Sequence, residues 1–142
     1  MKKHLLAILA TAVLLLVLVP SIAMAANYDT PVIGKDFTNN KILADTYYLL
    51  DENGDITKDG ADSKNYHIYY SGQTLTLNDA VLKDGLAVPG GTTIEVLGTN
   101  SITTANPGQL EGITNVSNGN ITLQGSGQLT ITASNSGIAY GH

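Results

Sequence analysis

The pattern Leu75-Thr-Leu77 returns twice farther along the chain, as Ile94-Glu-Val96 and as Ile121-Thr-Leu123. Each copy places an apolar side chain on either side of a polar one. This alternation is typical of a half-buried β-strand, because successive side chains of a strand point to opposite faces of the sheet. We therefore expect three equivalent strands, each with one face in the core and one face in solvent.

The second and third copies also share the segments that follow them. Gly98-Thr-Asn-Ser-Ile102 aligns with Gly125-Ser-Gly-Gln-Leu129, and a Gly-apolar step closes the copies at Gly85-Leu86, Gly112-Ile113 and Gly137-Ile138. Glycine at such a step is typical of a tight corner, because it turns without Cβ strain. Self-similarity at a period of roughly 20–27 residues, carried by strands, is the signature of a β-solenoid.

These repeats predict an all-β fold, namely a parallel β-helix (β-solenoid) of about three coils. Two ladders of stacked side chains would form its core, Leu75/Ile94/Ile121 and Leu77/Val96/Leu123. Each fully buried aliphatic side chain would stabilise the fold by about 1.5–3 kcal/mol. An antiparallel β-sandwich also has short strands separated by turn signals. It does not explain why the three copies share one internal order.

The repeats run to the last residues of the chain, Gly141-His142, which come just after the third Gly-apolar step. Three coils are about the minimum for a stable solenoid. We therefore expect an incomplete C-terminal end of the β-helix, where either further coils follow or the end self-associates by pairing with another chain.

The composition changes near Gly72, before the first copy. Residues 26–72 are predicted to form an N-terminal β cap, and residues 73–142 the β-helix repeats, because the first coil exposes an apolar end that must be covered. Asp45–Leu50 and Tyr66–Tyr70 are expected strands, and Asn53-Gly54 is an expected hairpin turn leading to a return strand at Ile56-Thr57. Almost no helix is expected after the first 25 residues. Six of the seven tyrosines lie in this region: Tyr28, Tyr47, Tyr48, Tyr66, Tyr69 and Tyr70.

The first 25 residues have the features of a secretory signal peptide. Lys2 and Lys3 precede the apolar run Leu5–Val19, and Ala23-Met-Ala25 is a cleavage site of small residues. The apolar run is short for a membrane span, so no span is expected after cleavage; an uncleaved N-terminal anchor is the alternative. The chain has no cysteine. Because small secreted eukaryotic domains usually rely on disulfides, a secreted or cell-surface bacterial protein is predicted.

The charge of the chain disfavours two classes of partner. The formal net charge is −5, and all seven basic residues are lysines. Nucleic acids and anionic membranes are usually bound by clustered Lys and Arg. We therefore expect no nucleic-acid partner and no anionic membrane surface as a partner.

The repeats resemble a known family at four places. These are Ser63-Lys-Asn-Tyr66, Leu75–Ala80, Leu97–Ile102 and Gly119–Thr132. They are similar to secreted repeat proteins of Gram-positive bacteria, which are right-handed parallel β-helix surface proteins of the broad pectate-lyase-like group, some of them described as carbohydrate-binding. The resemblance implies a β-helix, a surface location and sugar binding. No catalytic residue of a lyase carries over, because neither its metal-binding acids nor its basic catalyst can be matched here.

The segment Asp51-Glu-Asn-Gly-Asp55 has oxygen ligands at alternate positions, like the start of a calcium loop. It departs from an EF-hand, because Ile56 and Asp62 stand where Gly and Glu are required and no helix is expected beside it. A calcium site at Asp51, Asn53 and Asp55, with Asp59 as a further ligand, is one hypothesis. A solvated acidic hairpin turn is the other.

Other residues are candidates for catalysis or sugar binding, but their sequence patterns are less specific. His67 with Ser71 suggests a nucleophile and its base, but no third partner or nucleophile elbow accompanies them. Two acid pairs, Asp79/Asp84 and Glu95/Glu111, are candidates for glycoside hydrolysis. Exposed tyrosines could stack on sugar rings, or else cover the first coil.

The function expected from these features is a secreted or cell-surface module that is carbohydrate-binding or adhesive and non-catalytic, with a polysaccharide or cell-wall glycan as partner. The outer face of one strand ladder would provide the binding surface. The alternatives are a passive structural stalk or a fragment of a larger surface protein and, third, a polysaccharide lyase or hydrolase. No cofactor is expected apart from the hypothetical calcium.

Overall fold

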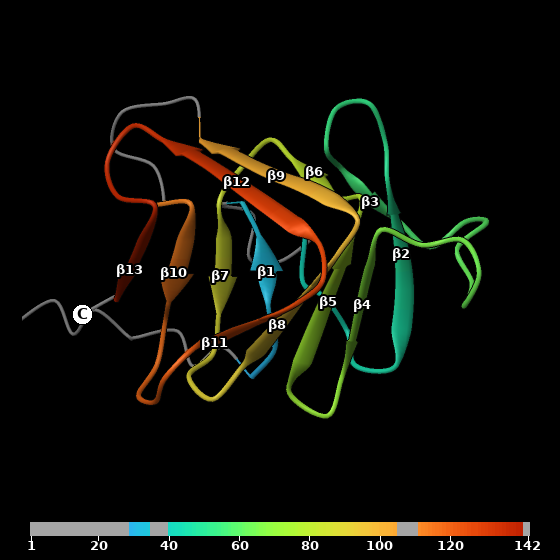
Figure 1. The fold of residues 1–142 in the computed structure, drawn as a ribbon. Coiled ribbons are helices and arrows are strands. Elements are labelled where there is room, and N and C mark those ends of the chain that lie inside the picture. Colours follow the sequence, from blue (N-terminus) through green and yellow to red (C-terminus); the bar gives the residue numbers. More distant parts are fainter. Residues whose placement is uncertain (1–28, 35–39, 105–110, 141–142) are drawn as a thin grey trace, which may run out of the picture.

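The computed structural model describes residues 29–34, 40–104 and 111–140, and within them the chain forms thirteen short strands and no helix (Figure 1). The predicted signal peptide, residues 1–25, lies outside the described residues. No helix in the described ranges is long and apolar enough to cross a bilayer. The strands are β1 (Val32–Ile33), β2 (Thr46–Leu50), β3 (Ile56–Thr57), β4 (Ile68–Ser71), β5 (Thr74–Asn78), β6 (Val81–Leu82), β7 (Leu86–Val88), β8 (Thr93–Leu97), β9 (Thr99–Thr104), β10 (Ile113–Asn115), β11 (Thr122–Gly125), β12 (Gln128–Ala133) and β13 (Ile138–Tyr140).

The strands form three sheets around a common core (Figure 1). A six-stranded sheet has the order β11-β8-β5-β4-β2-β3, a four-stranded sheet the order β1-β7-β10-β13, and a three-stranded sheet the order β12-β9-β6. The three-stranded sheet is parallel. The other two are mixed, because β4, β2 and β3 join the first antiparallel and β1 joins the second antiparallel.

The prediction of a parallel β-helix of about three coils with an N-terminal β cap is wrong. In the part of the chain that the structure describes there are three open sheets, two of them mixed, and none closes on itself or forms a solenoid. The strands expected in the cap are instead members of the same sheets as the repeats. All-β character is confirmed within the described residues, and so is the β2–β3 hairpin around Asn53-Gly54.

A tight turn at Gly72-Gln73 explains much of this difference. Ser71 pairs with Thr74, which leaves a two-residue loop between β4 and β5. Both loop residues have positive φ, 53° at Gly72 and 65° at Gln73. Positive φ at both positions is the type I′ geometry, whose twist matches that of antiparallel neighbours. The chain therefore reverses at Gly72 and brings β4 alongside β5, where the sequence analysis places a boundary between cap and repeats.

The first two copies of the repeated pattern pair as expected. Leu75 lies opposite Ile94, and Leu77 lies opposite Val96, in the parallel pair β5–β8. The side chains of Leu75, Leu77 and Ile94 are fully buried. The alternation of apolar and polar residues therefore predicted both the strands and their inward faces.

The third copy pairs two residues away from the predicted register. Leu123, not Ile121, lies opposite Ile94, and Gly125 lies opposite Val96. A Cβ atom on Gly125 would lie 2.2 Å from the carbonyl oxygen of Val96. Only glycine fits at this point, because the two backbones come too close for any side chain. The observed register places Gly125 there, and alignment of the apolar residues alone does not reveal this.

The Gly-apolar steps pair as expected, because Leu86, Ile113 and Ile138 are in register across β7, β10 and β13. The reason for glycine differs from the predicted one at Gly112, which is absent from the positive-φ positions. A Cβ atom there would lie 2.1 Å from Cγ2 of Ile131 and 2.6 Å from the carbonyl oxygen of Gly137. Gly112 is thus required for close packing and not for its freedom to turn.

The core lies between the three sheets and consists mostly of aliphatic side chains. Its buried members are Ile33, Ile42, Tyr48, Ile68, Tyr70, Leu75, Leu77, Ala80, Leu82, Leu86, Val88, Ile94, Val96, Ile102 and Ile113. Burial declines at the last strand of two of the sheets, where Leu123 is 45 % exposed and Ile138 is 51 % exposed. The packed interior is therefore built by β1, β2 and β4–β10, and the polar groups discussed next lie on its outside.

Candidate functional site

A continuous row of side chains crosses five neighbouring strands on the outside of the six-stranded sheet. Tyr47 pairs with Tyr69, Tyr69 with Thr76, Thr76 with Glu95, and Glu95 with Gln124. We call these five residues the outer row. Because neighbouring strands lie about 4.8 Å apart, the row is roughly 19 Å long. The sheet thus presents a regular line of side chains that runs perpendicular to its strands.

Three partly exposed tyrosines lie at one end of the outer row. The rings of Tyr47 and Tyr69 are stacked, with their centroids 4.2 Å apart and their planes inclined by 16°. Tyr66 lies edge-on to both, at 5.2 Å from Tyr47 and 6.4 Å from Tyr69. Such stacked and T-shaped pairs stabilise one another. We call Tyr47, Tyr66 and Tyr69 the tyrosine cluster.

The neighbours of these tyrosines in the sequence have the opposite role. Tyr48 and Tyr70 are buried in the core, at 2 % and 5 % exposure, because side chains alternate along β2 and β4. The composition alone predicts a single group of tyrosines that either covers the first coil or binds sugar. In a strand, adjacent residues point to opposite faces. The pairs Tyr47-Tyr48 and Tyr69-Tyr70 could therefore have shown that one tyrosine of each pair is buried and the other lies on the surface.

Contacts within the cluster raise the pKa of the Tyr47 phenol. Partial burial raises the pKa of Tyr47, and the nearby phenol of Tyr69, to which it is hydrogen-bonded, raises that pKa further. A neutral phenol can both donate and accept a hydrogen bond. The cluster therefore offers apolar ring surface together with uncharged polar groups.

The middle of the outer row supplies hydrogen-bonding groups. Thr76 Oγ1 donates to Glu95 Oε2 at 3.3 Å. Beside this row, hydroxyl side chains are in register on four strands: Ser71, Thr74, Thr93 and Thr122. We call these four residues the hydroxyl row. Together the two rows place polar side chains on all five strands, with the Glu95 carboxylate on the fourth of them and the Asp45 carboxylate bonded to Ser71.

Asp51, Asn53 and Asp55 of the calcium hypothesis lie in the turn between β2 and β3, and Asp59 follows β3. Asp51 Oδ1 accepts hydrogen bonds from the backbone N–H groups of Asn53, at 2.8 Å, and Asp55, at 2.9 Å. Asp59 N–H donates to Thr57 Oγ1. In the described ranges, no group of three or more His, Cys, Asp or Glu side chains is arranged to hold a metal. The turn is closed by Asp51 itself, and calcium binding there stays a hypothesis.

The same hydrogen bonds predict a measurable pH dependence. Hydrogen bonds to the Asp51 carboxylate lower its pKa. The bond from the N–H of Asp55 has the larger effect, and the bond from the N–H of Asn53 adds to it. A depressed pKa in the folded state contributes stability above the unfolded-state pKa, and this contribution is lost as the pH falls through the folded-state pKa. We expect Asp51→Asn to lose stability at neutral pH and to show a flatter decline in acid than the unmodified protein.

Urea unfolding from neutral pH down to strong acid measures this effect. Glu52→Gln, in the same exposed turn, is the matched control and should follow the unmodified protein. An Asp51→Asn variant whose stability declines in acid as steeply as the unmodified protein would contradict the assignment.

His67 and Ser71 do not form a catalytic pair. His67 Nδ1 accepts a hydrogen bond from the N–H of Leu50 at 2.9 Å, and Ser71 Oγ donates to Asp45 Oδ1 at 2.5 Å. Four residues of extended chain place the two about 13 Å apart along the strand. Each side chain has a structural partner of its own.

The predicted acid pairs are also separated by their partners. Asp79 Oδ1 accepts from the N–H of Thr99 at 2.7 Å. Glu95 faces the outer row, whereas Glu111 Oε2 accepts from Thr114 Oγ1 on the four-stranded sheet, at 3.1 Å. Asp84 lies beside Gly34. Asp79, Glu95 and Glu111 therefore each accept a hydrogen bond from a backbone or hydroxyl group.

A groove that the sequence analysis did not identify lies between the end of β2 and β6. It has a volume of about 470 Å³, and Asp51, His67, Asp79, Val81 and Lys83 are among its lining residues. The Lys83 ammonium donates to the backbone carbonyl of Glu52 across it. Its residues come from separate segments, so no motif in the sequence marks it.

Comparisons with known proteins do not assign the chain to a family. No protein-family model matches the sequence, and neither the curated proteins nor the solved structures give a match. The resemblance to surface proteins of Gram-positive bacteria stays a prediction.

Proposed function

We propose that the protein binds a neutral polysaccharide on the outside of its six-stranded sheet and performs no chemistry on it. The observation that carries the proposal is the tyrosine cluster at the end of the outer row. Sugar rings have apolar C–H faces and a rim of hydroxyl groups. Tyrosine suits such a surface, because it combines a large apolar ring with a polar hydroxyl group.

The arrangement of the cluster favours binding for a second reason. The three rings contact one another, so they are restricted before a ligand arrives. Restricted side chains lose less conformational entropy on binding than free ones. The cluster is therefore a pre-organised aromatic platform.

The two rows would then hold the glycan along its length. A chain of sugars that leaves the tyrosine cluster along the outer row crosses Thr76, which is only 6 % exposed, and reaches the partly exposed Glu95 and the exposed Gln124. The strand spacing of about 4.8 Å is close to the rise of one hexose in an extended glycan. Repeating hydroxyls can thus meet repeating acceptors and donors, strand after strand.

The charge of the protein favours an uncharged glycan. The formal net charge is −5, and the outer row contains a carboxylate but no lysine. A uronic-acid polymer would be repelled, whereas a neutral polysaccharide would not. Presentation of this face outside the cell is part of the proposal and depends on the signal peptide predicted at residues 1–25.

Substitutions at Tyr69 test the proposal. Tyr69→Ala removes the ring that stacks on Tyr47 and lies edge-on to Tyr66. We expect this variant to bind a neutral polysaccharide about 10-fold or more weakly, because truncating an aromatic anchor costs more than about 1 kcal/mol of binding free energy. Tyr69→Phe keeps the ring and is the matched control, with affinity expected within about 3-fold of the unmodified protein.

Affinity electrophoresis against a panel of soluble neutral and acidic polysaccharides measures these effects, and circular dichroism verifies the fold of each variant. Retardation by a neutral glycan that is lost in Tyr69→Ala and retained in Tyr69→Phe supports the proposal. Retardation that is equal in all three proteins, or absent from the whole panel, contradicts it.

A further inference from the structure

His67 extends the hydrogen-bond ladder between β2 and β4 with its side chain. The backbone pairing of these strands ends at Tyr48. Two residues farther along β2, the N–H of Leu50 donates to Nδ1 of His67, at 2.9 Å. The carbonyl oxygen of Tyr66, which the same register would bring opposite Leu50, accepts from Nδ2 of Asn78, at 3.1 Å. The imidazole ring therefore takes the place of a backbone acceptor at the end of β2.

The backbone of His67 is fixed independently of its ring. Its N–H donates to the carbonyl oxygen of Tyr48, and its own carbonyl oxygen accepts from the N–H of Asn78, both at 2.8 Å. Loss of the bond between the ring and Leu50 leaves these two bonds in place. A change in the ring therefore acts on the end of β2 and leaves β4 where it is.

The bond from Leu50 requires an uncharged imidazole. A backbone N–H can only donate, so Nδ1 of His67 carries no proton, and the proton of the neutral ring lies on Nε2. In the imidazolium both ring nitrogens carry protons, and both are donors. Protonation therefore sets two N–H groups against each other and removes the acceptor of Leu50. Histidine is the side chain whose charge changes between about pH 5 and about pH 8.

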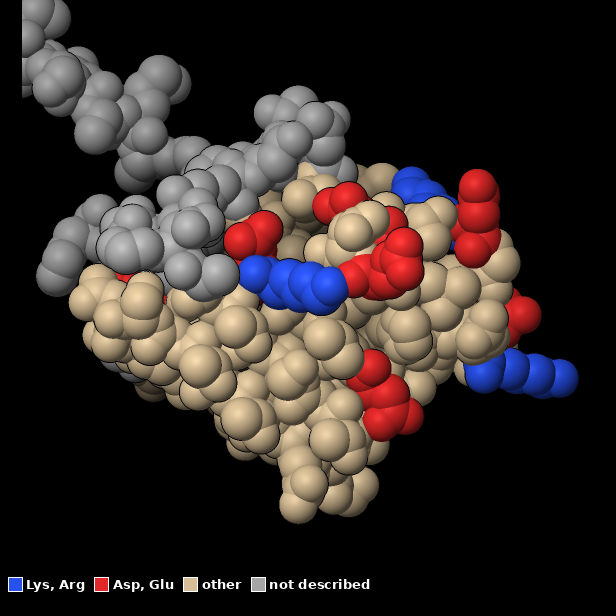
Figure 2. All heavy atoms as spheres, turned by 90° about the horizontal axis from the view of Figure 1, so that it is seen from above, with Lys and Arg blue, Asp and Glu red and all other residues tan. Residues whose placement is uncertain are grey.

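The groove beside β6 offers partners to the charged ring. His67 lines this groove together with four charged residues: Asp51 and Glu52 in the turn after β2, Asp79 between β5 and β6, and Lys83 directly after β6. In Figure 2 acidic and basic side chains lie together over the half of the molecule that holds β2 and β3. The three carboxylates attract an imidazolium, and Lys83 repels it. With a volume of about 470 Å³ and an excess of negative charge, the groove can accept the protonated ring.

We propose that His67 is a pH-sensitive switch at the end of β2. At neutral pH the uncharged ring accepts from Leu50 and holds the end of β2 beside β4. In mild acid the imidazolium leaves Leu50 and turns into the groove, toward the carboxylates. The N–H of Leu50 then lacks its acceptor, so the end of β2 and the turn that follows it loosen. The switch acts whether or not the outer row binds a glycan.

A second bond determines how far the turn can move. The Lys83 ammonium donates to the backbone carbonyl of Glu52, and this bond does not depend on the charge of His67. The turn therefore stays attached to the segment after β6 when the bond between Leu50 and His67 breaks. The expected change is a local loosening of the end of β2 and not an unfolding of the protein.

The titration of Asp51, in the same turn, is separable from that of His67. The N–H of Asp55 foremost, together with that of Asn53, lowers the pKa of the Asp51 carboxyl. The ordinary pKa of a carboxyl group already lies below that of an imidazole. Protonation of Asp51 therefore requires strong acid, whereas the proposed switch acts in mild acid.

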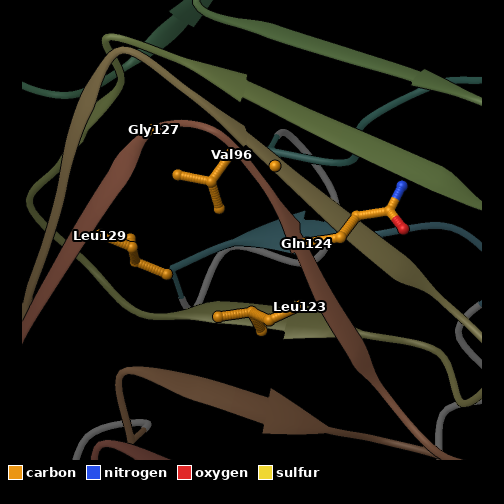
Figure 3. Close-up of a pocket in the computed structure, with 6 residues that line it drawn as sticks. Val96, Leu123, Gln124, Gly127 and Leu129 are labelled. Atoms are coloured by element: carbon orange, nitrogen blue, oxygen red, sulfur yellow. The ribbon is translucent and has the colours of Figure 1, made fainter.

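A second hollow provides an internal control. It has a volume of about 310 Å³, and none of the described residues that line it is titratable. In Figure 3 the side chains of Val96, Leu123 and Leu129 surround this hollow, and Gln124 points away from it. Mild acid should therefore leave the methyl signals of Leu123 and Leu129 unchanged.

Nuclear magnetic resonance of the unmodified protein tests the proposal. The ¹⁵N shifts of the His67 ring at neutral pH should show a bare Nδ1 and a protonated Nε2. As the ring becomes protonated between about pH 8 and about pH 5, the Leu50 amide should lose about 10-fold of its protection from hydrogen exchange, once the intrinsic pH dependence of exchange is divided out. A change of this size corresponds to one lost hydrogen bond.

His67→Asn is the matched control. Oδ1 of asparagine is as many bonds from the backbone as Nδ1 of histidine and can accept from Leu50, but it is not protonated in mild acid. Protection of the Leu50 amide in this variant should be the same throughout the pH range. The proposal is overturned by a protonated Nδ1 at neutral pH, by protection of Leu50 that stays constant while the His67 ring titrates, or by the same loss of protection in His67→Asn.

Discussion

Replacing Ile94 with alanine is expected to lower the free energy of unfolding by about 2–5 kcal/mol. Ile94 lies in the middle of β8, between Leu75 on β5 and Leu123 on β11. Its side chain is fully buried within the common core. The substitution removes buried aliphatic groups and leaves a cavity that the paired strands on both sides cannot collapse to fill.

Urea unfolding followed by circular dichroism measures this loss. Val81→Ala is the matched control, because Val81 is an aliphatic strand residue that is largely exposed, and its replacement should change the free energy by less than about 0.5 kcal/mol. If the two variants lost the same stability, Ile94 would not be at the centre of the core.

Replacing Asn100 with alanine is expected to cost about 2–4 kcal/mol, although the residue is polar. Asn100 is 1 % exposed and joins three segments. Its Oδ1 accepts from the N–H of Ala80 at 2.8 Å, and its Nδ2 donates to the carbonyl oxygens of Leu97, at 2.7 Å, and Gln128, at 3.3 Å. Alanine would leave these backbone groups without their partners in a place that water does not reach.

Two further variants separate this effect from a general intolerance of substitution. Asn100→Asp keeps an acceptor for Ala80 but turns a carboxylate toward the two carbonyl oxygens, so it should be at least as unstable as Asn100→Ala. Asn135→Ala changes an exposed asparagine and should be nearly neutral. Equal stability of Asn100→Ala and Asn135→Ala, measured by urea unfolding, would contradict the assigned network.

The parts of the fold that were predictable are those encoded by local patterns. Alternation placed Leu75 and Leu77 inside, and similarity between the first two copies paired them with Ile94 and Val96. Asn53-Gly54 marked a hairpin. Each of these signals lies within a few residues, and each depends on side-chain direction or on the φ angles that a residue tolerates.

The arrangement of the sheets was not predictable in the same way. Repetition indicated parallel pairing between copies, but it did not indicate that β4 and β1 would join the same sheets antiparallel. The reversal depends on Gly72-Gln73, whose second residue has positive φ without being Gly, Asn or Asp. The register of the third copy depends on Gly125 meeting the backbone of Val96, which is a contact between distant segments.

The candidate site was partly visible in the sequence. The tyrosines and the threonine-rich strands were identified, but their division between core and surface was not. Glu95 was considered as a catalytic acid, and the structure instead places it beside Thr76 in the outer row. Neighbours across a sheet are determined by register, which individual side chains do not reveal, and the predicted register of the third copy was wrong.

The central claim is that the tyrosine cluster and the outer row bind a neutral glycan. The most direct measurement is a nuclear magnetic resonance titration of the labelled protein with the oligosaccharide whose polymer retards it most strongly in electrophoresis. We predict the largest shifts on the ring signals of the tyrosine cluster, with smaller shifts along the outer row at Thr76 and Glu95. Largest shifts in the groove beside Lys83 or on β12 and β13, or no shifts at saturating oligosaccharide, would contradict the account.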